Sequence, residues 1–449
     1  MGRIFGTDGV RGIANRDLTC ELACEIAKAA GTIIREEKGS RCRFLLGTDT
    51  RSSASMLSAA ICAGLCAVGC DVTLLGVVPT PAVAYLTRAL KADAGVMLTA
   101  SHNPCQYNGI KIIGGTGFKL TDAEEEAIEA MVLDHARPAA LAGPEEMGRV
   151  DTGSGYVQLY IDHLRSTIKG NFDGLRLAVD CANGSASATA RQIFEGLGAQ
   201  CVFLNCEPDG VNVNRGCGSM HIGALADYVR AHGMDLGVAF DGDADRCLAV
   251  DSEGHLVDGD VLLAIFSRRL AREGRLAQNG VVVTVMSNIG FFKYAEETGT
   301  QAVTTKVGDR YVLEQIIAGG YNLGGEQSGH IIFFDHMTTG DGQLSALQLL
   351  DAMAQEQKPL SELRQVMRVY PQVIINAPAD AGMKAKLPHA KALWDMIAAL
   401  EGELEGSGRV LVRPSGTEPL IRVMVEGPEE QQIRRIAETV AKEIEKQLS

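Results

Sequence analysis

The sequence predicts an α/β protein, with three similar α/β domains that contain mixed sheets and a smaller C-terminal α+β domain, arranged around a central cleft. Two observations lead to this prediction. A pattern of strand, short turn, helix and strand occurs three times, and the last quarter of the chain departs from it. The length of 449 residues agrees, because domains of roughly 100–200 residues would number three or four.

The three copies are "RFLLGTDTRSSASMLSAAICAGLCAVGCDVTLLG", "RLAVDCANGSASATARQIFEGLGAQCVFLN" and the looser "GVVVTVMSNIGFFKYAEETGTQAVTTK". In each, an apolar strand leads through a Ser- or Asn-containing turn to a helix that ends near Gly, and a second strand follows. This order is typical of the βαβ unit, whose buried parallel strands are nearly continuous in Val, Leu and Ile. Three related α/β domains are therefore expected.

The last quarter instead has the strand-like runs "QVIINAP", "RVLVRPSG" and "PLIRVMVEG", together with two helical stretches. A smaller α+β domain fits this order best. We expect domain boundaries where loop residues coincide with a break in periodicity. The expected domains are residues 1–150, 151–252, 253–369 and 370–449.

The net charge of the chain bears on which partners it can bind. The formal net charge of −14 disfavours non-specific binding to nucleic acid or to an anionic membrane. The chain opens on the charged, glycine-rich run "GRIFGTDGVRG" and not on a signal peptide, so we expect a cytoplasmic protein. The sequence leaves the oligomeric state open, and a homodimer is compatible with it.

The twelve cysteines form no CxxC pair, so they predict neither a disulfide framework nor a zinc site. Cys62, Cys66 and Cys70 recur every four residues, which suits one buried face of a helix. The weakly polar stretch 58–70 that contains them is shorter than the ~20 apolar residues of a membrane span. We expect it to be a buried helix.

The motif "DGDADR" places Asp241, Asp243 and Asp245 at alternate positions after the apolar run "LGVAF". Three carboxylates this close repel one another unless a cation lies between them, and oxygen ligands select a hard ion such as Mg²⁺. An EF-hand is excluded, because Arg246 stands where that loop needs Gly and Ser252 where it needs Glu. A solvated acidic turn is the alternative.

The motif "RPSGTEP", from Arg413 to Pro419, lies between two strand-like runs. It combines a guanidinium group, two hydroxyls and a glycine amide, which are donors that suit phosphate oxygens, and Arg422 follows in the next strand. An anion pocket is therefore favoured over a plain hairpin loop.

Two glycine-punctuated loops carry weaker signals. "GEQSGH", residues 325–330, offers the mixed donors and acceptors that bind a sugar, although a turn without a ligand explains it equally well. "FGTDGVRG", residues 5–12, carries Arg11 and is equally compatible with a structural turn.

The motif "TASHNP", residues 99–104, follows the apolar run 94–98. Ser101 would need a base or a metal-activated electrophile to act as a nucleophile. His102 is its neighbour in sequence, but adjacent residues in an extended loop point apart, and the chain has no GxSxG elbow. We therefore expect no protease-like Ser-His pair. Taken alone, the motif predicts a structural turn more often than a catalytic one.

The four loops lie in different quarters of the chain, so a ligand shared by all of them would bind between domains. A serine, a hard cation, sugar-reading groups and an anion clamp together favour phosphoryl transfer to or from a sugar phosphate. In this order, the four motifs resemble the α-D-phosphohexomutase family over essentially the whole chain. "FGTDGVRG" and "GEQSGH" resemble the branch of that family that acts on glucosamine phosphates.

The resemblance implies that phosphorylated Ser101 donates its phosphoryl group to O1 of glucosamine 6-phosphate. Glucosamine 1,6-bisphosphate then turns around and returns its 6-phosphate to Ser101. The product would feed UDP-N-acetylglucosamine and bacterial cell-wall synthesis. The implied ligands of Mg²⁺ are the modified Ser101, Asp241, Asp243 and Asp245.

The resemblance also assigns roles to the remaining loops. Arg246 would face the transferred phosphate, Arg11 would add to the positive field, and Lys111 in "YNGIKII" or His330 would assist proton transfer. Lys111 as a plain surface charge is the alternative. Relatives that accept glucose or mannose phosphates tend to have Met where Gln327 stands, while Glu326 and Ser328 would bind sugar hydroxyls. The non-transferred phosphate would contact Arg413, Ser415, Gly416, Thr417 and Arg422.

Three other functions remain open. A phosphoglucomutase or phosphomannomutase would share the mechanism, and a phosphatase would release inorganic phosphate steadily. A non-catalytic sugar-phosphate sensor would have no need of a transferable serine, so the intact Ser101 argues against it.

Overall fold

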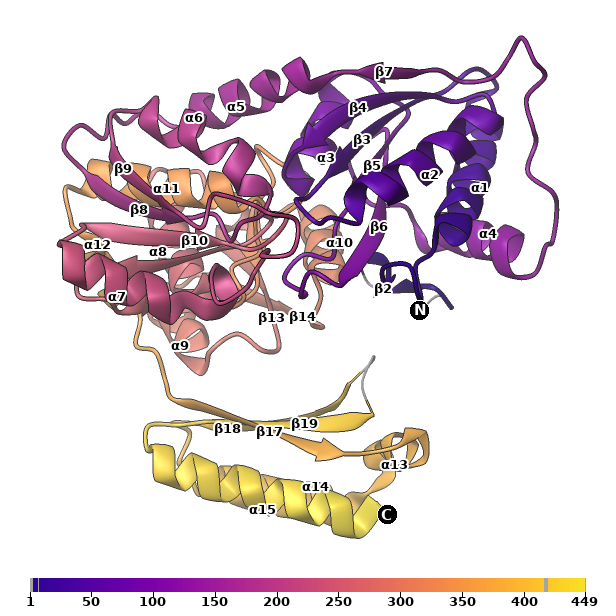
Figure 1. Ribbon diagram of the computed structural model, residues 1–449. Helices are drawn as coiled ribbons and strands as arrows, with labels where there is room; N and C mark the ends of the chain where they lie inside the picture. The colour runs from indigo at the N-terminus through magenta and orange to yellow at the C-terminus, as the bar shows by residue number, and fades with distance from the viewer. Residues whose placement is uncertain (1–2, 7, 416–418, 449) are drawn as a thin grey trace. The chain divides into compact units, whose positions relative to one another are not determined.

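The computed structural model describes residues 3–6, 8–415 and 419–448, whose elements are labelled in Figure 1. The chain divides into two compact units. The first comprises Met1–Met286 and Gln301–Val366, and the second comprises Ser287–Thr300 and Met367–Ser449. The expected fold class is confirmed: three sheets with helices lie in the first unit, and an antiparallel sheet with helices lies in the second.

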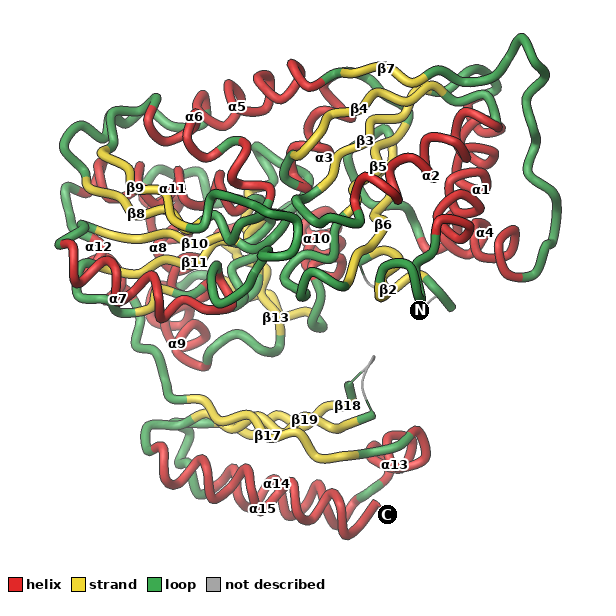
Figure 2. The backbone as a smooth tube through the Cα atoms, viewed as in Figure 1, coloured by secondary structure: helices red, strands yellow, loops and turns green. Residues whose placement is uncertain are grey.

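The first sheet has seven strands among the described residues. In order across the sheet they are β1 (Phe5–Gly6), β2 (Gly9–Ile13), β6 (Tyr107–Gly114), β5 (Ala94–Leu98), β3 (Arg43–Thr48), β4 (Asp71–Val77) and β7 (Val150–Thr152). The helices of this part are α1 (Cys20–Lys38), α2 (Ala54–Ala67), α3 (Thr80–Ala89) and α4 (Asp122–Leu133). Strand β3 pairs in parallel with both β4 and β5, which confirms the first βαβ unit. Helices α1 and α2 pack side by side (Figure 2).

The expectation that Cys62, Cys66 and Cys70 share one helix face is wrong for Cys70. Helix α2 ends at Ala67, and Gly69 then takes a left-handed φ of 79° that turns the chain into β4. Cys62 and Cys70 are buried and Cys66 is half-buried. The four-residue interval between the cysteines therefore extends beyond the end of the helix, and only Cys62 and Cys66 belong to α2.

The second sheet has the described strands β12 (Leu256–Val257), β11 (Cys247–Asp251), β10 (Leu236–Phe240), β8 (Arg176–Asp180) and β9 (Gln200–Leu204). Its helices are α5 (Val157–Ser166), α6 (Ala190–Glu195) and α7 (Ile222–His232). Strands β8 and β9 are parallel, which confirms the second βαβ unit. Strands β10 and β11 form an antiparallel hairpin, and β10 is buried along its whole length.

The third sheet has the described strands β14 (Gln301–Thr305), β13 (Gly280–Thr284), β15 (Leu323–Gly325) and β16 (Ile331–Phe333). The helices of this region are α8 (Gly259–Arg272), α10 (Asp309–Gly319), α11 (Gly342–Glu356) and α12 (Leu360–Leu363). Strands β13 and β14 are parallel, as the third copy of the pattern predicts. The helix between them, α9 (Ile289–Thr298), groups with the second unit.

The second unit contains an antiparallel sheet of β17 (Gln372–Pro378), β19 (Leu420–Glu426) and β18 (Arg409–Pro414). Helices α14 (Lys391–Gly402) and α15 (Glu430–Leu448) cover one face of this sheet, and α13 (Ala381–Lys386) follows β17 (Figure 1). Asn288 ties α9 to this unit, because its side chain donates to Tyr370 O at 2.9 Å and accepts from Tyr370 N at 3.1 Å.

Short 3₁₀ turns complete the described elements: η1 (Ser154–Tyr156), η2 (Ser185–Ala188), η3 (Ser219–His221), η4 (Ala277–Asn279), η5 (Arg364–Val366) and η6 (Leu387–His389). Within the described ranges, no helix combines the length and apolar character required to cross a membrane.

One buried carboxyl group makes stability depend on pH. Asp341 is fully buried and caps α11 by accepting from Leu344 N at 2.9 Å, and it accepts from the Tyr160 hydroxyl at 2.8 Å. Burial raises the pKa of Asp341 from 3.8 to about 7. Because the folded pKa lies above the unfolded value, the contribution of Asp341 to the free energy of unfolding falls as the pH rises from about 4 to about 7.

We therefore expect Asp341→Asn to cost more stability at pH 5 than at pH 8, as measured by urea unfolding at both pH values. Asp380→Asn is the matched control, because Asp380 caps α13 through Met383 N but is exposed. An equal loss at both pH values for Asp341→Asn would contradict the assignment.

Candidate active site

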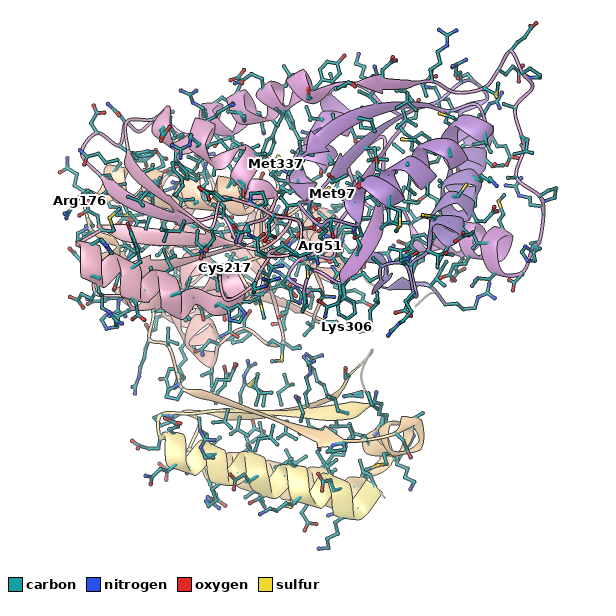
Figure 3. The ribbon with its side chains drawn as sticks, viewed as in Figure 1. Arg51, Met97, Arg176, Cys217, Lys306 and Met337 are labelled. Atoms are coloured by element: carbon teal, nitrogen blue, oxygen red, sulfur yellow. The ribbon has the colours of Figure 1, made fainter. Side chains whose placement is uncertain are left out.

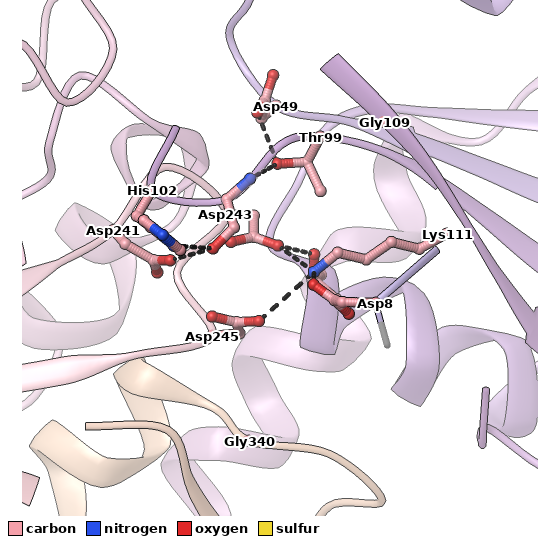
Figure 4. A network of polar contacts seen from close by, with 12 residues as sticks. Asp8, Asp49, Thr99, His102, Gly109, Lys111, Asp241, Asp243, Asp245 and Gly340 are labelled. Atoms are coloured by element: carbon pink, nitrogen blue, oxygen red, sulfur yellow. Dashed lines mark hydrogen bonds and ion pairs between the residues drawn. The ribbon is translucent and has the colours of Figure 1, made fainter. Parts of the chain in front are cut away.

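The loop that carries Ser101 begins where the fully buried strand β5 ends. Ser101 is itself fully buried and adopts a left-handed φ of 51°. Its Oγ donates a hydrogen bond to Asp241 Oδ2 at 2.7 Å, and its backbone N donates to Thr99 Oγ1 at 2.9 Å (Figure 4). The serine hydroxyl is therefore directed at the first aspartate of the "DGDADR" motif.

The expectation that His102 points away from Ser101 is wrong. Its Nδ1 lies 3.3 Å from Ser101 Oγ, because the left-handed backbone of Ser101 breaks the alternation of an extended loop. Nδ1 also lies 2.5 Å from Arg246 Nη1. Burial, together with the charges of Arg246 and Arg11, lowers the pKa of His102 to about 4. Since the guanidinium group already donates to Nδ1, the imidazole is neutral and is not placed as a base for Ser101.

The three aspartates lie in the loop that connects β10 to β11, and each offers a carboxylate oxygen within 4.8 Å of the others. All three are buried. Burial raises the pKa of Asp241 well above its ordinary value, and the nearby charges of Asp245 and Asp243 add to this effect. Asp243 Oδ1 and Asp245 Oδ1 are buried without a hydrogen-bond partner among the described residues. An all-oxygen set with two such atoms fits a hard divalent cation.

Lys111 projects from β6 into this cluster. Its Nζ lies 2.9 Å from Asp243 Oδ2, 2.9 Å from Asp8 Oδ2 and 3.6 Å from Asp245 Oδ2 (Figure 4). The side chain is 3% exposed, so the alternative of a plain surface charge is wrong. Burial opposes the charge, but Asp243, Asp8 and Asp245 together hold the pKa of Lys111 well above its usual value. In this structure Lys111 is a fixed cation.

The cluster continues through Lys119 to His330. Lys119 Nζ lies 2.6 Å from Asp8 Oδ1 and 2.5 Å from Asp309 Oδ2. His330 Nδ1 lies 3.6 Å from Asp245 Oδ2, and Gly340 N donates to His330 Nε2 at 3.1 Å. Burial lowers the pKa of His330, but the hydrogen bond and charge of Asp245 and the charge of Asp309 raise it overall. A Cβ at position 340 would lie 2.4 Å from that ring nitrogen, so this contact requires Gly340.

Two arginines lie beside this cluster. Arg246 Nη1 lies 3.9 Å from Asp241 Oδ2. Burial lowers the pKa of Arg246, but the charges of Asp241 and Asp245 raise it overall. Arg11 forms an ion pair with Asp8. Both residues therefore bring positive charge close to the serine and aspartate loops.

The "GEQSGH" loop connects the antiparallel strands β15 and β16. Glu326 Oε1 accepts a hydrogen bond from Gly308 N at 3.0 Å, which brings the loop between β14 and α10 beside it. Ser328 Oγ donates to Glu326 Oε2 at 3.5 Å, and Gln327 Nε2 donates to Asp258 Oδ2 at 3.3 Å.

The candidate phosphate loop belongs to the second unit. Arg413 on β18 is directly opposite Arg422 on β19, and Ser415 is buried with its carbonyl accepting from Lys384 Nζ at 2.8 Å. Facing like charges concentrate a positive field that suits an anion. The predicted contacts Gly416 and Thr417 lie outside the described residues.

Several residues that shape the site were not singled out from the sequence. Asp49 and Arg51 anchor the serine loop, and Thr80 Oγ1 donates to Asp243 Oδ2 at 2.6 Å. A signal existed for the first pair: "DTR", residues 49–51, follows β3 as "TASHNP" follows β5, and neighbouring parallel strands place such loops at one sheet edge. Asp8 lies within "FGTDGVRG", of which Arg11 alone was singled out, whereas Lys119 and Asn214 gave no comparable signal.

Comparison with known proteins places this geometry in a family. Residues 2–137, 158–254 and 258–370 match alpha/beta/alpha domains I, II and III of phosphoglucomutase/phosphomannomutase, and residues 354–443 match its C-terminal domain. A curated relative from Acetivibrio thermocellus, named phosphoglucosamine mutase, is 49% identical over 448 residues. The alignment covers 100% of this chain and 100% of the relative.

Two solved structures share the fold. An X-ray structure of a phosphoglucomutase/phosphomannomutase family protein from Burkholderia thailandensis aligns with a TM-score of 0.82 and 24% identity, over 98% of this chain and 97% of that one. N-acetylphosphoglucosamine mutase from Aspergillus fumigatus, solved with GlcNAc-6P and magnesium, aligns with a TM-score of 0.65 and 18% identity, over 99% and 96%. The resemblance carried by the four motifs is thus confirmed, and the chain belongs to the phosphoglucomutase/phosphomannomutase family.

Proposed function

We propose that this chain interconverts glucosamine 6-phosphate and glucosamine 1-phosphate through phosphorylated Ser101 and a glucosamine 1,6-bisphosphate intermediate. The observation that carries the proposal is the 2.7 Å hydrogen bond from Ser101 Oγ to Asp241 within a buried cluster of three aspartates. The relative named phosphoglucosamine mutase, 49% identical over the full chain, supports the choice of sugar. A cytoplasmic enzyme that supplies a precursor of UDP-N-acetylglucosamine is part of the proposal.

The aspartates Asp241, Asp243 and Asp245, with the phosphate of modified Ser101, are the residues that would hold Mg²⁺. When bound, that ion supplies positive charge that offsets the phosphoryl oxygens and the carboxylates. Lys111 adds a second, fixed positive charge beside Asp243. Arg246 faces the same loop, so the charge that spreads over the transferring phosphoryl group meets cations on more than one side.

In the forward direction the bond between Ser101 Oγ and phosphorus breaks, and a bond between phosphorus and O1 of the sugar forms. Lys111 and His330 are the candidates for assisting proton transfer, and the proton of that sugar hydroxyl passes to a base, a role that leaves His330 because Lys111 is already protonated. Because Lys111 is held protonated by three carboxylates, it is better placed to donate a proton to the departing Ser101 oxygen than to accept one. The bisphosphate then reverses and returns its 6-phosphoryl group to Ser101.

The other loops recognise the part of the substrate that does not react. Glu326 and Ser328 would accept and donate hydrogen bonds to sugar hydroxyls. The phosphate that stays on the sugar would be bound by Arg413, Ser415, Gly416, Thr417 and Arg422, whose hydroxyl, amide and guanidinium donors match its oxygens.

A phosphorus NMR time course tests the proposal. The Mg²⁺-loaded protein is mixed with glucosamine 6-phosphate and a trace of 1,6-bisphosphate, and glucose 6-phosphate is supplied in a parallel tube. We expect the 1-phosphate of the amino sugar to appear faster than that of glucose, without inorganic phosphate. Faster turnover of glucose 6-phosphate would show that glucosamine 6-phosphate is not the preferred substrate. Steady release of inorganic phosphate would show that the protein is a hydrolase.

Gln327 provides a narrower test of the sugar. We expect Gln327→Met to lower kcat/KM for glucosamine 6-phosphate relative to glucose 6-phosphate by about tenfold, because loss of a polar contact in a binding site costs roughly 1–3 kcal/mol. Gln365→Met is the control, because Gln365 is exposed and its amide donates to Ser361 O. An unchanged ratio for Gln327→Met would exclude this residue as a determinant of the sugar.

A further inference from the structure

The loop that carries Ser101 is held through its carbonyl groups by Arg51, which is only 2% exposed. Nη2 of Arg51 donates to Ser101 O at 2.9 Å and to Asn103 O at 2.8 Å. Nη1 donates to Pro104 O at 2.5 Å and to Tyr107 O at 3.0 Å. One guanidinium group thus binds three carbonyls of the segment that connects β5 to β6 and the carbonyl of the first residue of β6. Figure 3 marks Arg51 within the first unit.

A buried carboxylate fixes both Arg51 and the opposite side of the loop. Asp49 Oδ2 accepts from Arg51 Nε at 2.8 Å and from Thr99 Oγ1 at 2.7 Å. Thr99 Oγ1 in turn accepts from Ser101 N at 2.9 Å (Figure 4). The backbone N–H and the carbonyl of Ser101 are therefore both bound by one connected network.

A second clamp comes from the part of the chain that carries the second sheet. Asn214 Nδ2 donates to Ser101 O at 2.9 Å and to Asn103 O at 3.2 Å. A Cβ on Gly242 would lie 2.5 Å from Ser101 O and 3.0 Å from Asn214 Nδ2. The serine loop and the aspartate loop are therefore in backbone contact, and Asn214 closes that contact.

We propose that Arg51 and Asn214 are positioning residues for phosphoryl transfer, which hold Ser101 in its left-handed conformation so that Oγ faces Asp241. Serine rarely adopts a positive φ without support, and the four donated hydrogen bonds to Ser101 O and Asn103 O supply that support. Neither residue touches the hydroxyl itself. The inference rests on the proposed function, because it concerns the orientation of the phosphoryl group that Ser101 carries.

The proposal has a chemical signature that instability alone does not produce. A phosphoserine that is turned away from the sugar reacts with water: a bond forms between water oxygen and phosphorus, the Ser101 Oγ–P bond breaks, and inorganic phosphate leaves while the serine regains its proton. The ratio of phosphate released to sugar isomerised is a property of each folded molecule. It does not depend on what fraction of the sample is folded.

Asn214→Asp tests the proposal, because aspartate has nearly the same size, tolerates a left-handed backbone and lacks both N–H donors. The matched control is Asn212→Asp, since Asn212 lies two residues earlier, is half-exposed and donates to Glu207 O. Arg51→Lys is the second variant. Its control is Arg43→Lys, at the start of the preceding strand β3, because Arg43 donates to Leu90 O.

For Asn214→Asp and Arg51→Lys we expect kcat per folded enzyme to fall about 10- to 100-fold, as small misplacements of reacting groups do, with KM changed less than about threefold. The ratio of phosphate release to isomerisation should rise about tenfold, and both controls should match the parent protein. Should Asn214→Asp not fold, Asn214→Gly removes the same donors without backbone strain. Variants that equal their controls in kcat and in this ratio would overturn the inference, whereas a parent protein that isomerises no sugar phosphate would overturn the proposed function.

Discussion

Replacement of Ser101 with alanine is expected to lower the rate of isomerisation by about 10⁴-fold or more, because removal of a covalent nucleophile eliminates the route that it serves. Ser101 Oγ donates a hydrogen bond to Asp241 and lies 3.3 Å from His102 Nδ1. The hydrogen bonds made by the backbone N and O of Ser101 do not involve Oγ, so the variant keeps the support of the loop. The measurement is kcat for glucosamine 6-phosphate in the presence of trace bisphosphate. Mass spectrometry of the intact protein after incubation with the bisphosphate should show one added phosphoryl group on the parent protein and none on the variant.

The control for this prediction is Ser55→Ala. Ser55 is exposed at the start of α2 and its hydroxyl donates to Ser52 O at 3.4 Å. We expect parental turnover and parental phosphorylation for this variant. If Ser101→Ala still isomerised the sugar at more than about a hundredth of the parental rate, a phosphoserine pathway would be ruled out.

The sequence predicted the fold class because its signals are local. Buried parallel strands are continuous in apolar residues, and short turns with Ser or Asn lead from them into helices. Ser101 follows β5, the three aspartates follow β10 and Glu326 follows β15, so each motif could be placed at the end of a strand before its neighbours were known. This reasoning needed no knowledge of how the three sheets pack together.

The partners of these residues depend on packing between distant segments, which no local pattern encodes. Lys111 and Asp243 are separated by 132 positions in the chain, and Lys119 and Asp309 by 190. Arg51 lies within the first repeat as one polar residue of a turn, and its role follows only from the pairing of β3 with β5. The prediction that His102 points away from Ser101 failed for a different reason. It relied on the alternation of side chains in an extended loop, and the left-handed backbone of Ser101 removes that alternation.

Asp243→Asn is expected to weaken the response to Mg²⁺ by about 100-fold or more, which is at or above the loss seen when groups that support a metal site are removed. Asp243 Oδ2 already accepts from Thr80 Oγ1 at 2.6 Å and from Lys111 Nζ at 2.9 Å. The amide oxygen of the variant would take that position, and its NH₂ group would take the place of Oδ1, which has no partner among the described residues. A donor would therefore face the cation at the position where the parent protein offers an acceptor.

The test is a titration of metal-stripped protein with Mg²⁺, followed by both isomerase activity and the temperature of unfolding. The parent protein should regain activity and gain thermal stability, because a cation relieves the mutual repulsion of three buried carboxylates. Glu253→Gln is the control, because Glu253 belongs to a second acidic group with Asp251 and His255, in which Asp251 is already paired with Arg364 at 2.6 Å. Loss of the Mg²⁺ response in Glu253→Gln with its retention in Asp243→Asn would move the metal site away from Ser101 and would remove the physical basis for phosphoryl transfer there.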